Sequence, residues 1–148
     1  SASLKKVIQK DEQLENTSDE VVEDENVKRK RLEQNKKDQR LILLYQKVED
    51  IDNARNNEVK DIKRNIENDR LALATLEEKK EVVESTLAKN PKNKDNLNKE
   101  LGLIIENINS ITNNIVKNED SLNKINLRYM EDKERFLEIK ASATNVKK

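Results

Sequence analysis

The residues best suited to bind a charged ligand are seven bases near the start of this 148-residue chain. Four are consecutive, and the other three follow within the next nine positions. Such a run is typical of a nuclear localisation signal, a phosphate-binding stretch or a site for an acidic partner. A solvated helix face, or pairing with the acids at positions 19–25, would explain it more simply. The bases are Lys28, Arg29, Lys30, Arg31, Lys36, Lys37 and Arg40.

Several classes of catalysis lose their usual residues, because the chain has no His and no Cys. Ser-His-Asp and Cys-His arrangements and ordinary zinc sites are therefore excluded. The lone glycine, Gly102, cannot form a phosphate-cradling loop, which needs several glycines. Paired acids would need a pocket that shifts their pKa values. We expect no enzymatic activity, no cofactor, no metal and no small-molecule substrate.

The net charge is zero, from 30 basic and 30 acidic residues, but the charges are unevenly placed. Residues 1–26 carry three bases and eight acids, whereas residues 27–40 carry seven bases and two acids. The rest of the chain is mixed, which argues against strong attraction of the whole molecule to nucleic acid. We interpret 1–26 as an acidic segment that is flexible or ordered by a partner. Residues 27–40 are a basic helical lead-in, with the helix starting between Glu25 and Arg31.

The composition indicates long helices. Charged residues make up 41% of the chain and apolar residues 33%, with one Gly and one Pro. Typical globular domains are about half apolar and contain about 7% Gly. A compact α/β or all-β domain is therefore excluded, and an all-α rod or a disordered polyampholyte remains.

Residues 95–143 carry a sustained heptad pattern, in which apolar residues recur at alternating steps of four and three. Only Asn118 and Asp132 interrupt it. The pattern predicts a helix over 96–143 with one apolar seam, followed by a frayed tail at 144–148. The seam consists of Leu97, Leu101, Ile104, Ile108, Ile111, Ile115, Leu122, Ile125, Tyr129, Phe136, Ile139 and Ala143.

A second seam predicts a helix over 41–89. Its register slips near Arg55, where a four-residue insertion would unwind a supercoil locally without ending the helix. No Gly or Pro lies between Leu41 and Lys89, so we expect no break in this helix. The seam consists of Leu41, Leu44, Val48, Ile51, Val59, Ile62, Ile66, Leu73, Leu76, Val83 and Leu87.

The segment between the seams holds the only proline, Pro91. Proline lacks an N–H and disfavours helical geometry in the residue before it, so the first helix should end near Asn90. Asn93, Asp95 or Asn96 can cap the next helix. With a loop at 90–95, the two helices of about 45–50 residues would form an antiparallel coiled-coil hairpin.

Index arithmetic supports this hairpin, because facing positions of an antiparallel pair have a constant index sum. A sum of 184 pairs seven seam residues of each helix, from Leu87 with Leu97 to Val48 with Phe136. It also brings Arg55 to Tyr129, which would allow the guanidinium to stack on the ring, and it leaves weak layers where Ile66 meets Asn118 and Ile115 meets Asp69. The alternative is one long helix in a parallel dimer.

The open end of the predicted hairpin carries more apolar residues than one partner helix can cover. All three aromatics lie there. A second copy, joined base to base with the loops pointing outward, or another protein would cover the surplus; alternatively, residues 1–40 fold back over it. The expected partner or dimer contacts are Leu41, Ile42, Leu43, Leu44, Tyr45, Tyr129, Met130, Phe136 and Leu137.

These features favour a structural or scaffolding piece of a larger protein, of the kind found in cytoskeletal, kinetochore, spindle or chromatin assemblies. It would form a homodimeric rod and dock protein partners. The alternative is an arm that binds nucleic acid or an anionic membrane through residues 28–40 and the lysines at the loop. We expect an intracellular chain, cytoplasmic or nuclear. No apolar run approaches the roughly 18 residues that a membrane span needs.

Overall fold

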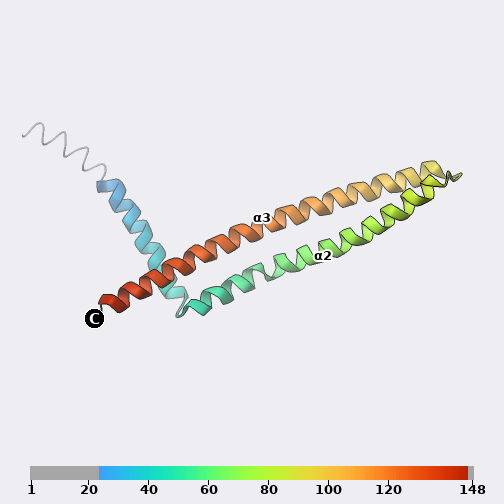
Figure 1. Cartoon of the computed structure of the whole chain (residues 1–148). Coiled ribbons are helices and arrows are strands. Elements are labelled where there is room, and N and C mark those ends of the chain that lie inside the picture. The colour runs from blue at the N-terminus through green and yellow to red at the C-terminus, as the bar shows by residue number, and fades with distance from the viewer. Residues whose placement is uncertain (1–23, 147–148) are drawn as a thin grey trace, which may run out of the picture. The chain divides into compact units, whose positions relative to one another are not determined.

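The computed structural model describes residues 24–146, and side chains to residue 144. Over this range the chain is helical, without a strand. An N-terminal helix covers residues 24–44, α2 runs Val48–Ala88, and α3 runs Lys94–Val146 (Figure 1). The expected all-α class is confirmed. The N-terminal helix is already present at residue 24, just before the expected start, and residues 1–23 of the acidic segment lie outside the described residues.

Helices α2 and α3 lie side by side and pack as a helical hairpin (Figure 1). The loop forms where the proline predicts it. Helix α2 ends at Ala88, and Asn90 has a φ of 59°, in the left-handed region that Asn tolerates better than most residues. The Asn90 amide donates to the Leu87 carbonyl at 3.1 Å, which satisfies one of the free carbonyls at the helix end.

Helix α3 begins at Lys94, two residues before the expected boundary, and extends to Val146 rather than residue 143. Among the three expected caps, Asn93 occupies the N-cap position. Its carbonyl accepts the first helical hydrogen bond, from the Leu97 amide at 3.1 Å.

The two predicted seams coincide with the least exposed positions of the helices. Every seam residue is buried or half-buried except Leu44 and Ala143, which are exposed. In the two layers predicted to be weak, the polar residues Asn118 and Asp69 are half-buried and the aliphatic residues are buried. Ile66 is 6% exposed and Ile115 is 9% exposed, which places both among the most buried side chains of the described chain.

The helix predicted over 41–89 is interrupted, which corrects our expectation. Residues 45–47 are not helical, although they contain neither Gly nor Pro. The Tyr45 amide still donates to the Leu41 carbonyl, and Lys47 then adopts an extended conformation. The Lys47 amide donates to the Asp50 carboxylate at 3.1 Å, as in one half of a capping box. This capping interaction starts a new helix at Val48, and the heptad pattern gives no indication of it. No further break occurs at Arg55, as expected.

The described chain divides into two compact units. The terminal unit contains residues 24–46 and 135–146, and the hairpin unit is Lys47–Glu134. Within the hairpin unit, three ion pairs connect α2 and α3. Arg70 meets Glu119 at 2.6 Å, Arg128 meets Glu58 at 2.6 Å and Lys133 meets Asp52 at 3.0 Å. Such surface pairs contribute about 0–1 kcal/mol each, so the seam supplies most of the stability.

The expected stacking of Arg55 on Tyr129 is wrong. Arg55 lies 3.7 Å from Asp52 and donates to Asn56 instead. The guanidinium of Arg128 lies 5.0 Å from the Tyr129 ring centroid, and the Tyr129 hydroxyl donates to Glu58. The index sum found an apolar register but could not assign side chains around the helix.

Candidate protein-docking surface

In the terminal unit, the N-terminal helix meets the last part of α3. Two large apolar side chains are buried here: Leu41 is 6% exposed and Phe136 is 2% exposed. The Lys140 ammonium lies 5.3 Å from the Phe136 ring centroid, a favourable cation–π distance. The sequence predicted both residues as partner contacts, but in this structure they form the interior of the terminal unit.

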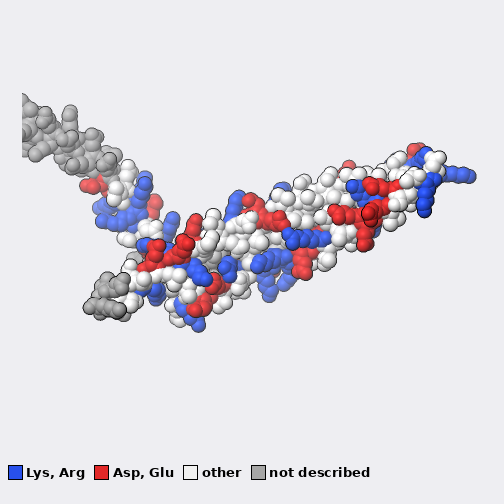
Figure 2. Space-filling view, viewed as in Figure 1, with Lys and Arg blue, Asp and Glu red and all other residues white. Residues whose placement is uncertain are grey.

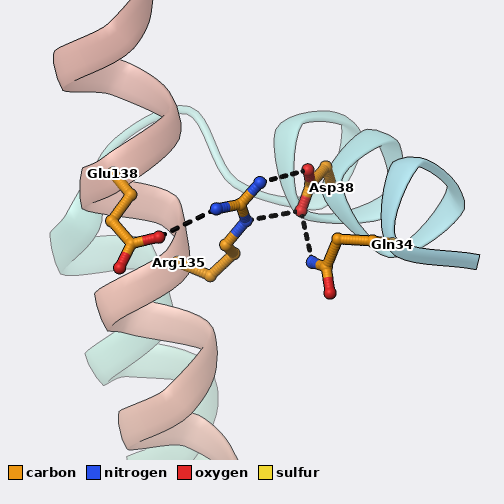
Figure 3. A network of polar contacts seen from close by, with 4 residues as sticks. All are labelled: Gln34, Asp38, Arg135 and Glu138. Atoms are coloured by element: carbon orange, nitrogen blue, oxygen red, sulfur yellow. Dashed lines mark hydrogen bonds and ion pairs between the residues drawn. The ribbon is translucent and has the colours of Figure 1, made fainter. Parts of the chain in front are cut away.

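A polar network fixes the two helices of this unit (Figure 3). Arg135 donates to both oxygens of Asp38, through Nε at 2.9 Å and Nη2 at 2.8 Å. Its Nη1 donates to Glu138 at 2.8 Å, and Gln34 donates to Asp38 at 2.9 Å. Bidentate pairs of this kind are stronger than simple ion pairs and also fix orientation. The network was not predicted from the sequence, although Asp38 is one of only two acids among the bases of residues 27–40.

The network lowers the pKa of the Asp38 carboxyl below its ordinary 3.8, chiefly because Arg135 donates hydrogen bonds to the ionised form. The ionised carboxylate therefore stabilises the folded chain above the unfolded pKa, and this contribution is lost as the pH falls through the folded pKa. We expect Asp38→Asn to flatten the loss of stability below about pH 4. Urea titrations at several pH values measure this. Asp61→Asn is the charge-matched control, because it removes one exposed acid from the hairpin unit.

The expected apolar contacts around the network are mostly exposed. In the terminal unit, Leu43 is 85% exposed and Leu44 is 63% exposed, and Ile42 and Leu137 are roughly half exposed. We call Ile42, Leu43, Leu44 and Leu137 the apolar surface. Met130, also exposed, belongs to the hairpin unit, and the aromatic residues Tyr45 and Tyr129 are half-buried. The surplus of apolar residues predicted from the sequence therefore exists, but only part of it is accessible.

All seven bases of the predicted basic site are exposed. None of them pairs with an acid in the part of the chain that the structure describes. Figure 2 shows Lys and Arg gathered on the N-terminal helix, whereas both signs of charge alternate along the hairpin. The loop lysines Lys89, Lys92 and Lys94 are exposed too.

One face of the N-terminal helix combines these bases with apolar side chains. We call it the outer stripe. Its members follow one another at steps of three, four, four and three, which places them on one side of a helix. The side is opposite to the one that holds Asp38 and Leu41, because stripe and interior positions are about half a turn apart. The stripe consists of Arg29, Leu32, Lys36, Arg40 and Leu43, all exposed.

The hairpin unit holds an open groove of about 690 Å³ that sequence reasoning did not find. Ile66, Leu71 and Leu122 line it, and so do both residues of the Arg70–Glu119 ion pair. A groove between two helices forms where the residues beside the two seams lie on the same side of the pair. Heptad positions alone do not show which of these residues share a side.

Near the open end of the hairpin unit, the Glu58 carboxylate accepts hydrogen bonds from Tyr129 and from Arg128. These donors lower the pKa of Glu58 below its ordinary 4.5, with Tyr129 the larger cause. The Glu58 carboxylate accepts a hydrogen bond from the Tyr129 hydroxyl and also forms an ion pair with Arg128. This arrangement orients α3 on α2.

Comparison of the chain with protein-family models, curated proteins and solved structures finds no match. Among residues 24–146, no helix has the length and apolar character that a membrane span requires. The same residues contain no group of three or more His, Cys, Asp or Glu side chains placed to hold a metal ion.

Proposed function

We propose that this chain is a non-enzymatic scaffolding domain of a larger protein. In this proposal α2 and α3 form an antiparallel coiled coil, and the terminal unit mediates homodimerisation and the docking of protein partners. Assemblies of the cytoskeletal, kinetochore, spindle or chromatin type are the setting that such a rod suits best. The seam supports the coiled coil, since the buried and half-buried positions follow the heptads through both helices.

The observation that carries the proposal is the apolar surface. Three consecutive residues, Ile42, Leu43 and Leu44, expose large side chains in the terminal unit, whose interior is already filled by Leu41 and Phe136. Isolated exposed leucines are ordinary, but several large exposed apolar side chains within one short segment favour a contact surface. Burying one leucine contributes about 1.5–3 kcal/mol, so two or three such residues suffice for a weak dimer.

Leu43→Glu tests the proposal. We expect the wild-type chain to show a monomer–dimer equilibrium in analytical ultracentrifugation, and Leu43→Glu to weaken the dimer at least about tenfold, because it places a charge in the apolar contact. Leu103→Glu is the matched control, since Leu103 is 63% exposed on the hairpin unit. A wild-type chain that stays monomeric at all concentrations, together with a silent Leu43→Glu, would refute the dimer.

A second candidate is a nucleic-acid or anionic-membrane arm, which the exposure of all seven bases favours. Replacing Lys28, Arg29, Lys30 and Arg31 by Ala should then weaken binding to a DNA duplex or to anionic vesicles. The salt dependence of the affinity should fall with the number of lost phosphate contacts, because each contact releases condensed counterions. Equal affinity of both chains at low salt would eliminate this candidate.

A further inference from the structure

The outer stripe is exposed in this structure although it has the composition of a contact surface. Leu32 and Leu43 lie on it eleven residues apart, or about three helical turns. Arg29, Lys36 and Arg40 lie between or beside them, and none is paired with an acid among the described residues. A segment that covers the stripe must therefore offer apolar side chains together with acids.

The charge of the stripe argues against a second copy covering its whole length, whereas the proposed dimer contact involves only Leu43 at its end. In a symmetric dimer the same surface of both copies meets, so the two stripes would bring six bases and no acid into one interface. Like charges opposed across an interface are strongly unfavourable. An acidic occupant instead gains a favourable interaction with each base.

The chain itself contains a segment of this composition directly before the N-terminal helix. Residues 11–23 hold six acids and no base. Leu14 and Val22 are eight residues apart in it, on one side of an extended chain, and can supply the apolar contacts. We propose that residues 11–23 dock along the outer stripe of the same chain and cover Leu43. The proposal rests on the proposed function, because covering Leu43 matters only if Leu43 contacts a partner.

The segment is long enough for this contact. From residue 24 to Leu43 the helix rises about 29 Å, at 1.5 Å per residue. The ten residue steps from Leu14 to residue 24 span up to about 33 Å when extended. A short tether gives an effective concentration in the millimolar range, so several weak ion pairs together with an apolar contact can hold the segment on the stripe.

Docking of this kind would regulate the proposed scaffold. The acidic segment competes with a partner for Leu43, and a partner must displace it to reach the apolar surface. Neutralising the acids should therefore strengthen dimerisation, in contrast to Leu43→Glu, which weakens it.

An engineered disulfide in the full-length chain tests the contact. The chain has no Cys, so Gln13→Cys with Gln39→Cys introduces one pair, next to Leu14 and one turn before Leu43. The effective concentration of the two thiols is measured in a glutathione buffer. We expect about a fivefold fall when five acids are neutralised, and a similar fall when salt rises from about 0.05 to 0.5 M. The matched chain carries Asp11→Asn, Glu12→Gln, Glu15→Gln, Asp19→Asn and Glu20→Gln, with the tether unchanged.

The outcomes separate the occupants. A disulfide within one chain that weakens with neutralisation and with salt supports the proposal. If the effective concentration of the two thiols is equal in the acidic and the neutralised chains, the segment is only tethered and does not dock, which overturns the proposal. A disulfide between chains that increases with protein concentration assigns the segment to a second copy, which also overturns it. The last two results leave the Leu43→Glu test of the proposed function standing.

Discussion

Phe136→Ala should lower the free energy of unfolding by about 3–4 kcal/mol, the range for truncating a buried aromatic side chain. Phe136 is 2% exposed and is the largest of the fully buried side chains in the described chain. The terminal unit has few other interior residues, so the cavity cannot be filled by a small rearrangement. Urea unfolding followed by far-UV circular dichroism measures the loss.

The neighbouring residue provides the control for this substitution. Leu137 is 49% exposed, and Leu137→Ala removes an aliphatic side chain from the same turn of α3. We expect a change of less than about 1 kcal/mol. Both chains should be compared at the same concentrations, because dimerisation would add to apparent stability. Equal losses for the two substitutions would mean that Phe136 is not the interior of the terminal unit.

Ile66→Ala has the second-largest expected effect, a loss of about 2–4 kcal/mol. The index arithmetic places Ile66 opposite Asn118 in a weak layer, whereas the structure leaves Ile66 only 6% exposed. A buried aliphatic loses its transfer free energy and leaves a cavity whether or not one neighbour is polar. Denaturant unfolding measures the difference from the wild-type chain.

Leu71→Ala is the matched control, because Leu71 is exposed on the same helix. We expect a change within about 0.5 kcal/mol. If Ile66→Ala costs less than about 1 kcal/mol, the layer is weak, as the sequence indicated, and the burial of Ile66 does not translate into stability.

Much of the fold could be predicted from the sequence because heptads and a single proline are local signals. The seams identify the buried positions of both helices, and Pro91 with Asn90 locates the loop. The break at residues 45–47 could not be predicted, since the step from Leu44 to Val48 keeps the heptad spacing. It depends on the hydrogen bond between Lys47 and Asp50, which competes with a continuous helix.

The candidate site was predicted less well, for a different physical reason. Composition shows that apolar residues gather near Leu41–Tyr45, but not which of them point inward. Leu41 is buried and Leu43 is exposed because the N-terminal helix packs through the side that carries Asp38. The partner of Asp38 is Arg135, a residue 97 positions away, and no local pattern connects them.

The sequence separations of the ion pairs also indicate the order in which parts of the chain fold. Their sequence separations increase away from the loop: 49 for Arg70–Glu119, 70 for Arg128–Glu58, 81 for Lys133–Asp52 and 97 for Asp38–Arg135. Closing a long loop costs more entropy than closing a short one, unless shorter contacts have already formed. The contacts between α2 and α3 should therefore form first beside the Pro91 loop and then progressively farther from it. The terminal unit should form last and unfold first.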